Sequence, residues 1–149
     1  MAPPGDRYWV GGTGNWSDDA NHWALTTNGT PGAGNIPTVD CDVFIDSNSG
    51  FSGGGIITVD TSSDCRDFTS SSGHTYTITS TTSLSFYGSM TLESTVTFNI
   101  SYPFFTSNSS GKTITTAGVT LNSSVTFFGT GSYTLLDNLT TLGGIEFQG

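Results

Sequence analysis

The residues with the clearest capacity for molecular recognition lie near the N-terminus. Three tryptophans, Trp9, Trp16 and Trp23, are spaced by seven residues in a segment rich in Gly, Asn and Asp. Tryptophan rings have an apolar face and a polar N–H, which suits contact with sugars or partner proteins. All three are candidate glycan or partner contacts, with Trp16 expected to be the most exposed. The commoner role of tryptophan is packing, in which case the rings cover the end of the fold.

A second group of candidates is acidic. Asp40, Asp42 and Asp46 could supply oxygen ligands to calcium, and paired acids elsewhere could serve as the general acid and base of a glycosidase. No complete D-x-[DN]-x-[DN]-G calcium loop occurs, however, and Asp commonly bonds nearby backbone in turns. We therefore expect turn chemistry, with no catalytic residue, no metal and no cofactor, and we do not expect an enzyme.

Cysteine and histidine offer little further chemistry. Cys41 and Cys65 could form one disulfide or remain two buried thiols, and the sequence leaves both readings open. His22 and His74 are isolated and add no zinc-ligand spacing. The G-x-S-x-G motif of a nucleophilic serine is absent.

Composition excludes several classes of partner. The net charge is −9 with only three basic residues, so clustered Lys and Arg for nucleic acid or anionic membranes are missing. No apolar run approaches the roughly 18 residues of a membrane-spanning helix. The N-terminus lacks the basic start and apolar stretch of a secretory signal, although the Ser- and Thr-rich composition resembles that of extracellular proteins.

The elements that must position these residues are predicted to be β-strands. Thr favours strands, helix formers are scarce, and we expect no helix. Phenylalanines recur at intervals near 20 residues, a period typical of one turn of a β-helix. The recurring residues are Phe68, Phe86, Phe105, Phe127 and Phe147. We predict an all-β parallel β-helix, or β-solenoid, with at least two strands per turn and with Phe86, Phe105 and Phe127 in one core. The alternative is a β-sandwich or jelly roll, whose strands also come at regular intervals.

The chain divides near residue 40. Residues 1–40 hold all the tryptophans and are interpreted as an N-terminal cap or anchoring segment, and residues 41–149 as a solenoid body of roughly 20-residue turns. Residues 139–147 are expected to form another turn with an open end. Such an end favours self-assembly, and we expect a homotrimer or larger assembly.

The segment from Arg7 to Trp23 contains the pattern W-x-G-G-x-G-N-W-S-D-x-x-x-x-W, and it is followed by Asn35-Ile-Pro37 and Asp42-Val-Phe-Ile-Asp46. This arrangement resembles the β-helix repeat modules of phage tail-fibre and virion-surface proteins and of bacterial adhesin-like surface proteins. The resemblance implies a right-handed parallel β-helix with structural or attachment work, and it brings no catalytic residues.

Together these observations favour a structural component of a virion or extracellular surface assembly, such as a phage fibre, tail or capsid decoration, that supports host or surface attachment. Expected partners are the chain itself and other virion or surface proteins, with a host glycan as a further candidate. A carbohydrate-binding adhesin is the alternative. A polysaccharide-degrading β-helix enzyme is a weaker alternative, because the acids available after residue 67 are few.

Overall fold

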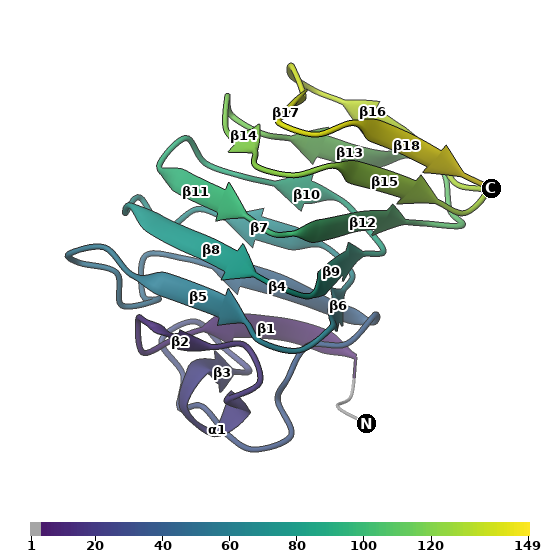
Figure 1. The fold of residues 1–149 in the computed structure, drawn as a ribbon. Coiled ribbons are helices and arrows are strands. Elements are labelled where there is room, and N and C mark those ends of the chain that lie inside the picture. The colour runs from purple at the N-terminus through teal and green to yellow at the C-terminus, as the bar shows by residue number, and fades with distance from the viewer. Residues whose placement is uncertain (1–3) are drawn as a thin grey trace.

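The protein is a parallel β-helix. The computed structural model describes residues 4–149 and shows three parallel sheets wound into one continuous coil, with the N-terminal segment at one end and the C-terminus at the other (Figure 1). Five complete turns follow an incomplete first one, and each complete turn contributes one strand to each sheet. The predicted solenoid is therefore confirmed, and the turn contains three strands.

The three faces of the coil are called sheets A, B and C. Sheet A contains, in spatial order, β3 (Trp23–Ala24), β1 (Gly5–Trp9), β4 (Cys41–Ile45), β7 (Phe68–Ser70), β10 (Met90–Thr91), β13 (Lys112–Thr115) and β16 (Tyr133–Leu135). Sheet B contains β2 (Gly14–Asn15), β5 (Ile56–Val59), β8 (Tyr76–Ser80), β11 (Val96–Asn99), β14 (Thr120–Leu121) and β17 (Thr140–Thr141). Sheet C contains β6 (Ser63–Cys65), β9 (Ser83–Phe86), β12 (Tyr102–Thr106), β15 (Val125–Phe128) and β18 (Ile145–Gln148).

An aromatic column runs through sheet C. Phe86 pairs in register with Phe105, Phe105 with Phe127, and Phe127 with Phe147, while Cys65 precedes them. The successive rings are stacked with centroids 5.1, 5.2 and 5.2 Å apart. This spacing follows the separation of neighbouring strands, roughly 4.8 Å, because parallel in-register pairing places like residues directly above one another. The predicted shared core of Phe86, Phe105 and Phe127 is confirmed.

Phe68 does not belong to that column. It pairs with Val43 on one side and Met90 on the other, and so lies in sheet A. The interval between Phe68 and Phe86 is close to the other intervals although the two residues lie in different sheets. This is because β6 and β7 are separated by only two residues at a corner. The position in sheet C that corresponds to Phe86 is occupied by Cys65. The recurring phenylalanines thus predicted the length of a turn correctly, although Phe68 lies on a different face of the coil from the other four.

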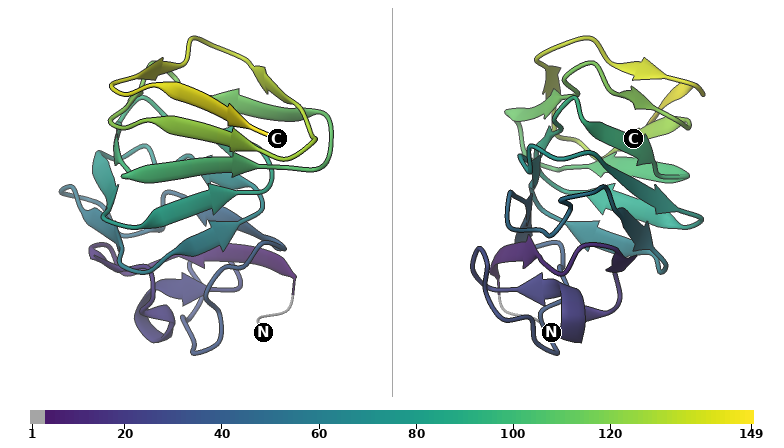
Figure 2. Two further views of the ribbon diagram at one scale, coloured as in Figure 1. Left: turned by 45° about the vertical axis from the view of Figure 1, so that its right-hand side comes forward. Right: turned by 90° about the vertical axis from the view of Figure 1, so that its left-hand side faces the viewer.

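The N-terminal segment 1–40 does more than cover an end. Within it, β1 pairs in parallel with β4, and β2 pairs in parallel with β5, so these strands form an incomplete first turn. β3 then returns antiparallel along the outer edge of β1. The single helical turn α1 (Asp19–His22) lies beside it at the bottom of the coil (Figure 2), and it is an exception to the prediction of no helix.

Truncation of the aromatic column tests the register. Phe105 is fully buried, so Phe105→Ala should lower the free energy of unfolding by about 3–5 kcal/mol, as expected for a large cavity in a core. Tyr102 lies on the outer face of the same strand with 57% of its surface exposed, and Tyr102→Ala should change stability by less than about 0.5 kcal/mol. Urea unfolding of both variants provides the measurement. Equal losses for the two variants would show that the inward and outward positions are assigned wrongly.

Candidate functional site

The three tryptophans are buried, which corrects the expectation that Trp16 is exposed. Trp9, Trp16 and Trp23 each have 0% of their surface accessible. Trp23 meets both of the other rings edge to face, with centroids 5.1 Å from Trp9 and 4.7 Å from Trp16. Two of the indole N–H groups donate to backbone carbonyls, from Trp9 to Gly12 and from Trp23 to Trp16. In this structure the rings close the apolar interior at its N-terminal end and are not available to stack on a sugar.

The Gly-rich run beside the tryptophans makes room for this packing. The His22 ring stacks on Trp9 with centroids 4.6 Å apart, and its Nδ1 lies 2.8 Å from the Val10 carbonyl oxygen. A Cβ at Gly14 would lie 1.9 Å from Nε2 of His22, so a larger residue could not occupy this position without moving the ring. Gly12 adopts a φ of +73°, which side chains disfavour. The motif therefore encodes a packed end of the coil.

The three calcium candidates are not brought together. Asp42 forms two 2.6 Å hydrogen bonds with the Arg66 guanidinium, whereas Asp46 accepts hydrogen bonds from Thr27 and from the Asn48 backbone. Asp40 lines a separate surface groove of about 360 Å³ between residues 36–40 and 61–64. Within residues 4–149, no three His, Cys, Asp or Glu side chains converge in a way that could hold a metal ion.

The cysteines are both buried, and no disulfide joins Cys41 to Cys65. Burial, together with the nearby Asp64 carboxylate, raises the pKa of the Cys65 thiol well above its ordinary value. A thiol with a raised pKa is less reactive because the thiolate is the nucleophile. Of the two readings that the sequence left open, the structure matches the buried thiols.

Several acids instead connect neighbouring turns. Glu93 accepts hydrogen bonds from the hydroxyls of Ser70 and Ser72 and from the backbone N–H groups of Ser72 and Gly73, all at 2.7 to 2.8 Å. Asp137 accepts from Thr116 and Ala117 one turn below it. These carboxylates satisfy backbone donors at the corners, where the chain leaves one sheet and the next strand has not begun.

Hydrogen bonding changes the acidity of these groups. Burial alone would raise the pKa of Glu93, but hydrogen bonds from the Ser72 hydroxyl and the Gly73 N–H outweigh it and lower the pKa. The pKa of Asp42 is lowered in the same way, since hydrogen bonds from Arg66 and the Asp67 N–H outweigh its burial. The pKa of Asp137 is lowered chiefly by the Thr116 N–H. In all three cases the lowered pKa favours the charged carboxylate, which is the form that accepts these hydrogen bonds.

The outer face of sheet C carries aromatic side chains. Tyr102 and Phe104 point outward from β12, and Phe128 points outward from β15. Phe104 and Phe128 contact each other edge to face, with centroids 5.3 Å apart, and Phe104 pairs in register with the buried Thr126. Neighbouring outward positions are polar, including Ser83, which pairs with Tyr102. This face combines exposed ring surface with hydroxyls.

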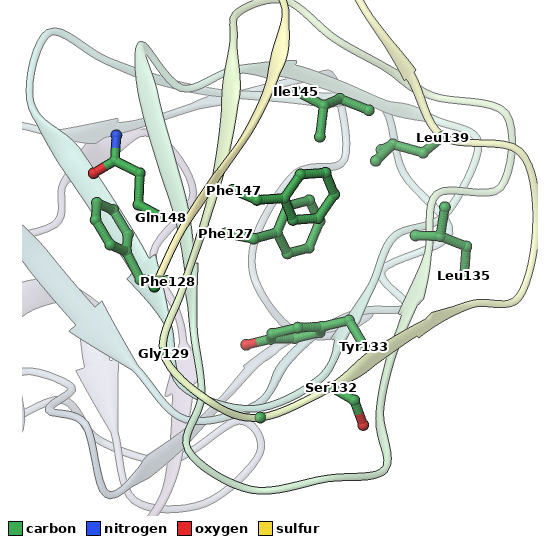
Figure 3. Close-up of a pocket in the computed structure, with 12 residues that line it drawn as sticks. Phe127, Phe128, Gly129, Ser132, Tyr133, Leu135, Leu139, Ile145, Phe147 and Gln148 are labelled. Atoms are coloured by element: carbon green, nitrogen blue, oxygen red, sulfur yellow. The ribbon is translucent and has the colours of Figure 1, made fainter.

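The C-terminal end of the coil is hollow and apolar. A cavity of about 500 Å³ opens there, lined by aromatic and aliphatic side chains from the last two turns (Figure 3). Phe147 lies over Phe127 and is 79% exposed. Tyr133 forms another wall, and its hydroxyl donates to the Phe86 carbonyl at 3.0 Å. The expected last turn is therefore present, and its strands are β16, β17 and β18.

Two features of the structure were not predicted from the sequence: the outward aromatic side chains of sheet C and the burial of Arg7. The outward aromatics of sheet C could have been found from strand alternation, since Phe104 and Phe105 are adjacent and must point to opposite faces. Arg7 occupies the first inward position of sheet A, directly below Val43, and is only 1% exposed. One of its guanidinium nitrogens donates to the Asp6 carbonyl at 2.9 Å. Nothing in the sequence Arg7-Tyr8-Trp9 led us to predict that the arginine is buried.

Comparison with known proteins finds no matching family model, curated protein or solved structure. Within the described residues, no helix has the length and hydropathy needed to cross a membrane.

The corner carboxylates predict a loss of stability in acid. A group whose pKa is lowered by folding stabilises the fold above its unfolded pKa, about 4 for these acids, and loses that contribution as the pH falls through the folded value. The free energy of unfolding should therefore be nearly constant above about pH 5 and fall toward pH 3. Glu93→Gln should be about 1 kcal/mol less stable at pH 7 and show a smaller fall in acid.

Urea unfolding at a series of pH values measures this dependence. Glu146→Gln is the matched control, since this acid is exposed on β18 with its carboxylate 3.4 Å from the Gln148 side-chain amide. The control should follow the wild-type curve. If Glu93→Gln also follows it, the corner contacts of Glu93 do not contribute to stability.

Proposed function

We propose that this protein is a structural component of a virion or extracellular surface assembly that supports attachment to a host or surface. The observation that carries the proposal is the continuous backbone pairing along all three sheets, because it makes a stiff rod of the kind that suits a spacer or fibre element. On this proposal the protein works at the virion surface or outside the cell, with copies of itself and other surface proteins as partners.

A feature of the sequence also supports the proposal. The opening from Arg7 to Trp23 resembles the β-helix modules of phage fibres and adhesins, and its tryptophans and glycines build the closed end of this coil. A homotrimer remains the expected form of a fibre built side by side from such rods.

Fractionation of the source organism or its phage particles tests the location. An antibody against the chain should detect it in purified particles or in the surface fraction, and cryo-EM of that material should show a coil of five turns beside other proteins. A cytoplasmic enzyme followed in the same fractions is the control. Recovery of the chain only with that control would overturn the proposal.

A carbohydrate-binding adhesin is a second candidate, favoured by the outer face of sheet C. Tyr102 is 57% exposed there, beside the half-buried Phe104 and Phe128. Aromatic faces with adjacent hydroxyls are suited to stacking on sugar rings and hydrogen bonding to their hydroxyl groups. This face replaces the buried tryptophans as the proposed glycan contact.

A glycan array with two variants distinguishes this candidate. If the face binds a glycan, Tyr102→Ala should weaken binding by about two- to tenfold, the loss expected for one stacked ring. Tyr8→Ala is the matched control, because Tyr8 stacks on Phe44 on the outer face of sheet A, with ring centroids 5.0 Å apart. If Tyr8→Ala reduced glycan binding and Tyr102→Ala left it unchanged, the outer face of sheet C would be excluded as the glycan contact.

A further inference from the structure

Sheet C begins one turn later than the other two sheets. Sheets A and B each have a strand in the first turn, β1 and β2, whereas the first strand of sheet C is β6 in the second turn. Figure 1 shows β6 as the lowest strand of its sheet, directly below β9. Residues 16–40 connect β2 to β4, and they form α1, β3 and loops in place of a strand in sheet C. This gap in the sheet is internal to the chain, with described sequence on both sides of it.

The edge of β6 that faces the gap has backbone groups with no strand beside them. On its other edge, the Cys65 carbonyl oxygen accepts a hydrogen bond of 2.9 Å from the Tyr87 N–H. Neighbouring residues of a strand in a parallel sheet direct their backbone groups to opposite sides, so the N–H and C=O of Asp64 point into the gap. Among residues 4–149, no backbone group forms a hydrogen bond with either of them.

Backbone pairing stops before this open edge and resumes after it. Before the edge, the Trp16 N–H donates to the Thr58 carbonyl oxygen at 2.7 Å. After the edge, the Arg66 N–H donates to the Cys41 carbonyl oxygen, also at 2.7 Å. The open stretch therefore lies between Thr58 and Arg66, and it can pair with an added strand of only a few residues.

The groove of about 360 Å³ described above lies in this gap. Residues 61–64 form one wall and residues 36–40 the other. Ile36 packs against the apolar core of the coil, and Pro37 has no N–H to offer to β6. An occupant must therefore bring its own backbone donors and acceptors to Asp64. An extended peptide does this when it adds a strand to the edge of a sheet.

Two carboxylates without internal partners make the groove acidic. Asp40 is exposed and Asp64 is half-buried, and both line the groove. Within the described part of the chain, neither side chain forms a hydrogen bond or an ion pair. The neighbouring cation Arg66 is held by Asp42 through two hydrogen bonds of 2.6 Å. A positively charged side chain on the occupant would therefore be attracted to the groove.

Strand alternation determines which residue of the occupant carries this charge. The residue opposite Asp64 would lie on the same outer face, so a Lys or Arg there could reach the carboxylate. The residues on either side would face inward together with Ser63 and Cys65, which are buried. Apolar side chains suit those inward positions. The fitting segment thus has a basic residue between two apolar residues.

A second copy of this chain has no such segment to offer. The sequence contains three basic residues, of which Arg7 is buried and Arg66 is bonded to Asp42. The third, Lys112, lies in β13, which is already paired on both sides by β10 and β16. The occupant with the matching charge is therefore a different protein.

We propose that the groove beside β6 binds an extended segment of another protein, which adds a strand to sheet C and places a Lys or Arg opposite Asp64. The inference goes beyond the proposed function, because it defines a partner by its chemistry and applies wherever the protein is found. The opposed charges lie at the surface, so binding should weaken as the salt concentration rises.

An NMR titration with synthetic peptides tests the charge preference. The probe is the capped peptide Thr-Val-Lys-Val-Thr, and the matched control peptide has Glu in place of Lys. The Lys peptide should bind to the wild-type chain and the Glu peptide should not. Asp64→Asn should weaken binding of the Lys peptide by about two- to fivefold, the loss expected for one exposed ion pair. Its circular dichroism spectrum should be unchanged, because the carboxylate has no internal partner.

Glu146→Gln is the matched control variant. It removes one negative charge from β18, at the other end of sheet C, and should bind the Lys peptide as the wild-type chain does. Equal weakening by Asp64→Asn and Glu146→Gln would show that net charge alone attracts the peptide. That result would overturn the proposal, as would a wild-type chain that fails to bind the Lys peptide at millimolar concentration in low salt.

Amide hydrogen exchange tests the addition of a strand. At about 90% saturation with the Lys peptide, the Asp64 amide should exchange about tenfold more slowly, because exchange then occurs only from the unbound fraction. The Tyr87 amide is the internal reference, since it already donates to Cys65 in the free chain. Binding that leaves exchange of the Asp64 amide unchanged would overturn the proposed strand addition. None of these measurements depends on where the protein is found, so their failure is distinguishable from failure of the location test.

Discussion

Parallel, in-register pairing between successive turns is the constraint on which this structure depends. Each strand takes its backbone partners from the turns above and below, so equivalent residues are placed in columns roughly 4.8 Å apart. The column from Cys65 to Phe147 is stable because aromatic rings at this spacing can stack, as four phenylalanines do here. The same constraint makes a single misplaced residue costly, since it disturbs the turns on both sides.

The corners of the coil are where this pairing fails, and polar side chains compensate there. Carboxylates such as Glu93 and Asp137 accept the N–H groups that no strand takes up, and serine and threonine hydroxyls add further contacts. This use of acids explains how a chain with few basic residues tolerates a net charge of −9: the anions are satisfied by backbone donors rather than by cations. Arg66 with Asp42 is the one salt bridge among the described residues.

The sequence was most informative where one residue type repeats on one face. The recurrence of Phe86, Phe105 and Phe127 predicted the coil and its core. The interval between these residues equals the length of one turn, and residues one turn apart point in the same direction. It could not assign Phe68 to sheet A, since a corner two residues long leaves the spacing almost unchanged. It also could not show that Trp16 is buried, because this depends on the return of β3 along β1 and on the His22 ring packed against Gly14.

The two ends of the coil differ, and this difference gives the molecule a direction. Each turn pairs its strands only with those of the turns beside it, so folding can be described as addition of turns to an existing edge, with a nucleus that must first close a turn on its own. The tryptophan-filled end joins residues that are close in sequence, including an antiparallel return and a helical turn, and is the part of the coil best suited to form first. From there each completed turn is a template for the next. Growth of the coil therefore runs in one direction, from the tryptophan-filled end toward the C-terminal turns.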